Sequence, residues 1–216
     1  GVTSVTGPIA DRIESAFVMS RKFPCLYKQK KMKPFLMFGP PGSGKTYSVK
    51  EIVVYLQREL HLYLDQEPRI NLFLATGASM KGKYVGETEK NIRSYFESAN
   101  RAAGEKGLSV LFIDEFDAIA SSRLISNDSG SASAVTELLQ TLDGVKQYKN
   151  VLTIAATNYP WVLDAAILSR FTNSLFVDVP TNNELRTAMN KLFAARLTNY
   201  NKKESNSLDS IKNDVI

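Results

Sequence analysis

Eight consecutive residues near the start of the chain have the types and spacing of a phosphate-binding loop. Residues 39–46 read GPPGSGKT, which fits the pattern G-x-x-x-x-G-K-[ST]. Glycines let backbone N–H groups turn toward phosphate oxygens, and a helix that follows adds the positive end of its dipole. In such a loop the lysine contacts the β- and γ-phosphates and the threonine hydroxyl binds Mg²⁺. We therefore predict that the whole loop contacts a nucleotide: Gly39, Pro40, Pro41, Gly42, Ser43, Gly44, Lys45 and Thr46.

Two adjacent acids end an apolar run farther along the chain and could supply hydrolytic chemistry. The run Val110–Ile113 predicts a buried strand, and Asp114 and Glu115 follow it directly. Because α/β sheets bind ligands at the carboxyl ends of their strands, Asp114 is expected to hold Mg²⁺, directly or through water. Glu115 is expected to polarise the attacking water as a general base. Asp117 fits an acid at the start of a helix better than a metal ligand.

An amide after another apolar run leaves two interpretations open. Asn158 follows the predicted strand Val151–Ala156, with one residue between them. Its side chain could orient the water between Glu115 and the γ-phosphate. On local sequence alone, a turn-forming asparagine before Tyr159-Pro160 is the better interpretation, because asparagine side chains bond readily to the backbone of turns.

Strands and helices alternate along the chain, which predicts the framework that positions these side chains. The spacing of apolar residues predicts helices over Ile9–Val18, Thr46–Leu64, Glu87–Ala103 and Ala134–Leu142. Short apolar runs predict strands over Pro34–Phe38, Ile70–Ala75, Val110–Ile113, Val151–Ala156 and Ser174–Val179. The Ser-, Asn- and Gly-rich segment Ser121–Ser133 predicts a mobile loop. Apolar strands that alternate with helices are typical of a parallel sheet covered on both faces.

Composition limits the kinds of site that the chain can build. Its 216 residues are 44% hydrophobic, enough for a core without disulfides, and the net charge of +5 fits an acidic partner without specifying one. One cysteine, Cys25, excludes an internal disulfide, and one histidine, His61, excludes a histidine-rich metal site. No apolar run reaches the roughly 20 residues of a membrane-spanning helix, and the first residues do not resemble a signal peptide. A soluble intracellular protein is expected.

The ordered set of motifs resembles the AAA ATPases over about residues 9–180. It comprises GPPGSGKT (Walker A), LFIDEFD (Walker B), AATN and LDAAILSRF. The Vps4/katanin/spastin group, and Vps4 most of all, is similar also in KFP and LY within residues 22–27, TNYPWVLD at 157–164 and KYVGE at 83–87. The resemblance implies an α/β fold: a five-stranded parallel-sheet P-loop NTPase, the AAA large subdomain, with helices on both faces and the start of a helical lid. It also implies ATP or ADP with Mg²⁺, and it adds Tyr47 to the nucleotide-binding residues.

Further roles follow from the resemblance. Asn158 becomes the sensor that orients the attacking water, which reverses the local interpretation. Arg170 becomes an arginine finger that reaches the ATP of a neighbouring subunit; the plainer alternative is a surface arginine near a helix end. Lys83, Tyr84 and Val85 become the first pore loop, in which Tyr84 grips an extended polypeptide. The alternative for Tyr84 is an exposed tyrosine in a glycine-flanked turn.

Some features depart from the family pattern. Vps4 proteins carry consecutive arginines where Ser169-Arg170 leaves only one, so hydrolysis could be slower or regulated differently. Trp161 is interpreted as a packing residue, which could lie near the subunit interface. Residues 1–180 are predicted to form the large nucleotide-binding subdomain, and residues 181–216 the incomplete start of the small helical lid or a tail. A fragment is therefore expected, which could be monomeric although the full-length protein should form a hexamer.

Three functions are compatible with these features. The first is a Vps4-like motor that hydrolyses ATP in a ring and pulls protein substrates, disassembling ESCRT-III-like assemblies through their tails. The second is a microtubule-severing ATPase of the spastin or katanin type, because Lys81 and Lys83 suit acidic tubulin tails. The third is a weakly active nucleotide-dependent scaffold, suggested by Ser169. No nucleic-acid partner is expected. The protein should be cytoplasmic and reach endosomal membranes transiently, as a peripheral protein held by its partners only.

Overall fold

A five-stranded parallel sheet organises residues 2–179, the first of the two units into which the chain divides; residues 180–216 and residue 1 form the second. The structure is a computed structural model that describes residues 11–15, 17–19, 32–63, 69–84, 86–122, 129–143, 148, 150–171, 173–187, 189–190 and 193–194. Cys25 and Val85 therefore lie outside the described residues.

The strands follow one another in the sheet in the order β2-β3-β4-β1-β5, and all neighbours are parallel. Their bounds are Phe35–Phe38 for β1, Ile70–Thr76 for β2, Leu108–Asp114 for β3, Val151–Thr157 for β4 and Asn173–Phe176 for β5. The predicted parallel α/β sheet is thus confirmed, and each predicted strand is present. The order places β1, which precedes the phosphate loop, beside β4 rather than beside β2.

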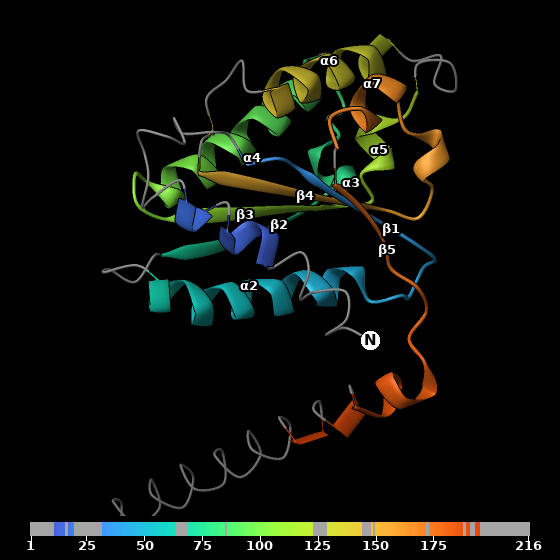
Figure 1. Ribbon diagram of the computed structural model, residues 1–216. Coiled ribbons are helices and arrows are strands. Elements are labelled where there is room, and N and C mark those ends of the chain that lie inside the picture. Colours follow the sequence, from blue (N-terminus) through green and yellow to red (C-terminus); the bar gives the residue numbers. More distant parts are fainter. Residues whose placement is uncertain are drawn as a thin grey trace, which may run out of the picture. The chain divides into compact units, whose positions relative to one another are not determined.

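Helices cover both faces of the sheet, as predicted (Figure 1). Helix α2 (Lys45–Tyr63) lies under one face, and the helical residues 11–15 and 17–19 share its apolar cluster through Ile13 and Phe17. The opposite face carries α3 (Gly77–Met80), α4 (Glu87–Ala103), α5 (Asp117–Ala120), α6 (Ser129–Asp143) and α7 (Ala165–Leu168). A short 3₁₀ helix, η1 (Pro160–Val162), follows β4.

Strand β3 shows why its near-continuous apolar sequence forms a central strand. Its side chains alternate between the two apolar clusters, so that Leu108, Val110 and Phe112 pack on the α2 side. Leu111 and Ile113 pack on the side of α4 and α6. All five are at most 1% exposed. Burial on both faces therefore needs apolar residues at every position and not at alternate ones.

Helix α6 corrects the predicted loop Ser121–Ser133, because α6 begins at Ser129. Ser and Gly have low intrinsic helix propensity, which is why the local composition predicts a loop. Tertiary packing overrides that preference here. Val135 and Leu138 are fully buried against the core, and Glu137 forms an ion pair of 3.1 Å with Arg93 of α4.

Strand β5 is shorter than predicted and ends at Phe176, although the apolar pattern continues to Val179. Strand β5 lies at the edge of the sheet, and β1 is its neighbour there. The Val177 N–H donates to the Phe38 carbonyl at 2.8 Å, and Phe38 is the last residue of β1. After Phe38 the chain enters the phosphate loop, so the residues of β5 beyond this bond have no neighbouring strand with which to form hydrogen bonds.

The second unit contains a helix over residues 182–187. The Thr181 N–H donates to Glu184 Oε2 at 2.7 Å, which satisfies one of the free donors at the start of that helix. Assignment of residues 181–216 to the start of a helical lid stays a prediction. In the part of the chain that the structure describes, no helix combines the length and the apolarity that crossing a membrane requires.

Candidate active site

The carboxyl ends of three neighbouring strands bring together segments that are far apart in sequence. Strand β1 leads into the loop at residues 39–44, Asp114 is the last residue of β3, and Asn158 follows β4. Because β4 lies between β3 and β1, these three segments meet at one edge of the sheet. This is the edge at which α/β sheets bind their ligands.

Lys45, the first residue of α2, lies at the centre of this junction and is 7% exposed. Its Nζ donates to the carbonyl oxygens of Gly39 and Pro40 at 3.0 and 2.9 Å and to Ser43 Oγ at 3.3 Å. It also donates to Asn158 Oδ1 at 2.7 Å, across 113 residues of sequence. Burial lowers the pKa of Lys45, and the negative charge of Asp114 opposes that effect. These four acceptors are uncharged, so a phosphate oxygen bound here would form a stronger hydrogen bond with the ammonium, because both partners would then carry opposite charges.

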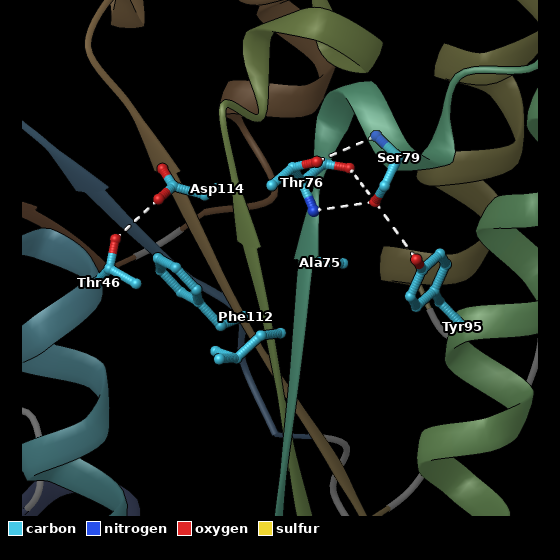
Figure 2. Close-up of a pocket in the computed structure, with 8 residues that line it drawn as sticks. Thr46, Ala75, Thr76, Ser79, Tyr95, Phe112 and Asp114 are labelled. Atoms are coloured by element: carbon cyan, nitrogen blue, oxygen red, sulfur yellow. Dashed lines mark hydrogen bonds between the residues drawn. The ribbon is translucent and has the colours of Figure 1, made fainter.

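Thr46 and Asp114 form the second contact of the junction (Figure 2). Thr46 Oγ1 donates to Asp114 Oδ2 at 2.8 Å, while Asp114 Oδ1 accepts the Glu115 N–H at 2.9 Å. Mg²⁺ prefers oxygen ligands and binds proteins through one or two groups, taking its other ligands from water and phosphate. A hydroxyl and a carboxylate held this close together are a donor set that fits Mg²⁺.

A cavity of about 300 Å³ lies next to this pair, between Thr46 and the end of β2. Its lining residues are Thr46, Leu74, Ala75, Thr76, Ser79, Tyr95, Phe112 and Asp114. Figure 2 shows that Thr76 and Ser79 bond reciprocally, each N–H to the other's hydroxyl, at 3.1 and 3.0 Å. Ser79 Oγ also lies 3.3 Å from the Tyr95 hydroxyl. The cavity therefore has a polar rim that includes both candidate metal ligands.

The loop before Lys45 has the backbone that a phosphate cradle requires. Gly42 and Gly44 have φ values of +76° and +90°, which residues with a side chain rarely adopt. Loops of this kind arrange successive N–H groups around an anion. The residues present therefore fit ATP with Mg²⁺: the loop and Lys45 would hold the phosphates, and Thr46 and Asp114 the metal. When bound, the metal supplies a positive charge that stabilises negative charge developing on the phosphate oxygens.

Glu115 has an unusual backbone conformation that the local sequence does not predict. Its φ is +49°, a left-handed value that is uncommon outside glycine. The next residue, Phe116, donates its N–H to the Ala156 carbonyl of β4 at 2.9 Å, so the chain turns sharply at Glu115 and returns to the sheet. Glu115 itself remains exposed. Such strained residues concentrate at functional sites, and here the strain falls on the expected general base.

Asp117 takes the place expected of an acid at a helix start. It is the first residue of α5, and its Oδ1 accepts the Thr157 hydroxyl at 2.6 Å. Thr157 is 1% exposed, and its Oγ1 also accepts the Tyr159 N–H at 3.0 Å. The first bond ties the end of β4 to α5, and the second fixes the backbone across Asn158, which helps to hold the Asn158 amide against Lys45.

Arg170 is held away from the junction by its own chain. Its guanidinium forms an ion pair with Asp143, the last residue of α6, and donates to Ser169 Oγ at 3.1 Å. The Ser169 hydroxyl in turn donates to the Ala166 carbonyl at 2.7 Å. Among the residues described, no hydrogen bond or ion pair joins Arg170 to the nucleotide site. Its 40% exposed side chain would have to act on a neighbouring subunit if it is a finger.

Tyr84 stands on the loop between α3 and α4 and is 79% exposed, with Lys83 exposed beside it. Val85, the third predicted residue of this loop, lies outside the described residues. The exposure of Tyr84 is compatible both with a contact residue and with a plain turn tyrosine.

Two aromatic residues singled out from the sequence, Tyr47 and Trp161, differ in their contacts and exposure. Burial and a hydrogen bond to Glu51, one turn farther along α2, raise the pKa of Tyr47. The Tyr47 hydroxyl is thus engaged by its own helix. Trp161 is 73% exposed on η1, with its ring centroid 5.6 Å from that of Tyr159. It is therefore not buried in the core of its own chain, and its packing near a subunit interface stays a prediction.

Comparison with known proteins decides the family. The profile of the ATPase family associated with various cellular activities (AAA) matches residues 35–179, well over half of the chain. The chain belongs to the AAA ATPase family. The matched range covers the AAA phosphate loop, the acids after β3 and the amide after β4 that the geometry brings together.

Several AAA proteins are similar over most of this chain. Protein SAV of Sulfolobus acidocaldarius is 33% identical over 94% of the chain and 24% of its own length. Vacuolar protein sorting-associated protein 4B of Pongo abelii is 31% identical over 84% of the chain and 38% of its own length. The vesicle-fusing ATPase of Caenorhabditis elegans is 34% identical over 82% of the chain and 21% of its own length. The chain therefore spans well under half of each of these AAA relatives.

Sequence reasoning did not identify several residues that shape this AAA site or hold Arg170. Thr157 and Asp143 act through contacts with distant segments, and no local pattern marks them. Gly77 lies so close to the Glu115 carbonyl that a Cβ there would collide with it, and a glycine directly after a strand is a usable signal of close approach. Thr76 and Ser79 form a capping box at the start of α3, but the usual sequence signature has Glu or Gln in the place of Ser79, so the sequence gives no clear signal of it.

Replacement of Gly39 by alanine is expected to destabilise the AAA fold and weaken nucleotide binding. The added Cβ would collide with the Val177 carbonyl oxygen, where β5 meets the loop. Relieving such overpacking costs about 3 kcal/mol. Gly104→Ala is the matched control for backbone strain: both glycines have positive φ values, +158° at Gly39 and +58° at Gly104, but a Cβ at Gly104 would meet nothing within 4 Å. It should cost about 1 kcal/mol from backbone strain alone. Urea unfolding would measure the free energy of unfolding of both variants. Equal decreases in that free energy would show that the structure relieves the collision at Gly39 without cost.

Proposed function

We propose that this AAA chain binds ATP with Mg²⁺ and hydrolyses the terminal phosphate, and that a ring of subunits uses the reaction to pull protein substrates. The observation that carries the proposal is the 2.7 Å hydrogen bond between Lys45 Nζ and Asn158 Oδ1. It puts the Lys45 ammonium, at the start of α2, next to the amide that follows β4, with Asp114 and Glu115 at the end of the neighbouring strand β3.

Each of these groups has a distinct part in the proposed reaction. Glu115 accepts a proton from the attacking water, and Asn158 orients that water toward the γ-phosphate. Lys45 stabilises charge on the transferring phosphoryl group, to which Arg170 of a neighbouring subunit adds a second positive charge. Phosphoryl transfer to water therefore depends here on positioning and on electrostatic stabilisation.

The proposed substrate is an acidic, extended segment of a protein. Tyr84 offers an exposed ring that can contact any side chain, and Lys81 and Lys83 make its surroundings positive. Relatives named vacuolar protein sorting-associated protein 4 favour a Vps4-like role in which ESCRT-III-like tails are pulled and their assemblies taken apart. In that role the protein acts as a hexamer in the cytoplasm and reaches endosomal membranes through its partners.

Two other functions rest on particular observations. The basic residues Lys81 and Lys83 beside Tyr84 would equally suit acidic tubulin tails, which favours a microtubule-severing ATPase as the second candidate. Ser169 bonds to the Ala166 carbonyl and leaves the site with a single arginine, which favours slow hydrolysis and a nucleotide-dependent scaffold.

Phosphate release, measured at a series of protein concentrations with ATP and Mg²⁺, separates these functions. We expect turnover per chain to rise with concentration, because Arg170 completes a neighbour's site, and to rise further with ESCRT-III tail peptides. Sedimentation of the protein with microtubules, together with no binding of those peptides, would favour severing. Turnover at background throughout the series, with ATP still bound, would favour the scaffold.

A further inference from the structure

The loop that carries Tyr84 is tied to the first turns of α4 by its backbone. One carboxylate oxygen, Glu87 Oε2, accepts the Lys83 N–H at 2.7 Å and the Tyr84 N–H at 3.1 Å. The Glu87 N–H returns a bond to the Tyr84 carbonyl at 3.2 Å. The Gly82 N–H donates to Thr88 Oγ1 at 2.9 Å. Residues 82–84 therefore lie along the start of α4 in a defined conformation.

The contact between the loop and Glu87 is close as well as polar. A Cβ at Gly82 would collide with the Glu87 side chain, so the loop backbone lies directly against it. Glu87 bonds to main-chain N–H groups, which leaves the side chains of Lys83 and Tyr84 exposed. Bonds from backbone N–H groups to a carboxylate are charge-assisted and stronger than neutral ones.

Helix α4 gives the loop a rigid support. Its Ile92, Phe96 and Ala99 are at most 1% exposed in the core, and Asn91 Nδ2 donates to the Met80 carbonyl at 3.2 Å. Because α4 is packed into the core, a loop that is hydrogen-bonded to the start of this helix is held in a fixed position relative to the core. Without that bonding, ordering the loop would consume part of the free energy of binding.

We propose that Glu87 is a positioning residue: its carboxylate fixes the backbone of residues 82–84 and so holds Tyr84 ready to contact an acidic, extended polypeptide. This inference rests on the proposed substrate role of Tyr84. Glu87 acts through the loop and not through substrate, because its carboxylate is turned to backbone donors. The exposed side chains of Lys81 and Lys83 are thus available for contact with an acidic substrate.

Backbone amide exchange in the 216-residue chain tests the bonding itself, whatever the substrate is. Slow exchange is expected at the amides of Lys83 and Tyr84, and Glu87→Ala should accelerate it about tenfold or more. Glu87→Gln keeps an acceptor oxygen and should retain most of the protection. Glu89→Ala removes a second acid from the first turn of α4 and is the matched control for helix-dipole effects. Unchanged exchange in Glu87→Ala would overturn the inference.

Binding of a fluorescein-labelled polyglutamate peptide tests the consequence, with polylysine as the charge control. Glu87→Ala should raise the Kd for polyglutamate about tenfold, the effect of returning freedom to one backbone residue, whereas Glu87→Gln and Glu89→Ala should stay within about twofold. Tyr84→Ala should weaken binding at least as much. If Tyr84→Ala binds normally, the proposed substrate role is wrong. If Tyr84→Ala loses binding but Glu87→Ala does not, the positioning role alone is wrong.

Discussion

Glu115→Gln is expected to lower steady-state ATP turnover by about 10²–10⁴-fold while ATP still binds. The substitution keeps the size and hydrogen-bonding capacity of the side chain but removes the base that accepts the proton of water. Lys45, Thr46 and Asp114 are untouched, so the groups assigned to the phosphates and Mg²⁺ remain. The left-handed φ of +49° at this position is a cost that glutamate and glutamine share, so stability should change little.

Phosphate release and binding of a fluorescent ATP analogue would measure the two effects separately. Glu105→Gln, an exposed acid in the turn after α4, serves as the control and should behave like the parent chain in both assays. Undiminished turnover in Glu115→Gln would show that another group is the base. Loss of nucleotide binding would instead give Glu115 a role in ligand affinity.

Arg170→Ala is expected to lower turnover by about 10³–10⁵-fold, because an arginine finger stabilises charge on the transferring phosphoryl group. The side chain lies outside the nucleotide site of its own chain, so the effect must cross a subunit boundary. A mixture of Arg170→Ala and Glu115→Gln chains should therefore recover part of the activity. Some interfaces in that mixture would combine an intact base with an intact finger. No recovery in mixtures that assemble would exclude action in trans.

Asp143→Asn is the matched control for the finger, because it removes the ion pair and keeps Arg170. Exposed ion pairs contribute only about 0–1 kcal/mol, so stability should hardly change. Turnover should stay within about tenfold of the parent chain. A loss as large as that of Arg170→Ala would mean that Arg170 acts through its bond to Asp143 and not as a finger.

Local sequence determined the five strands and the long helices, and the chemistry that they carry. The apolar runs predicted each strand, and the periodicity of Glu87–Ala103 predicted both ends of α4. The loop before Lys45 could be found because phosphate binding needs glycines at fixed spacing. These features follow from interactions within a few residues. The predicted bounds were wrong in two places. Packing outweighed local preference at the start of α6, and β5 ended early because its neighbouring strand ends there.

Tertiary structure alone decided which of these elements meet. No local pattern places β4 between β1 and β3, yet that order puts Asn158 against Lys45. The family resemblance implies a site role for Asn158, but only the strand order supplies the contact that such a role requires. The pairing of Arg170 with Asp143 and the turn at Glu115 also depend on distant partners. The physical reason is the same in each case: these bonds join segments whose separation along the chain gives no periodic signal. The sequence by itself thus determined the kinds of group available for phosphoryl transfer, and the packing of the sheet decided their arrangement.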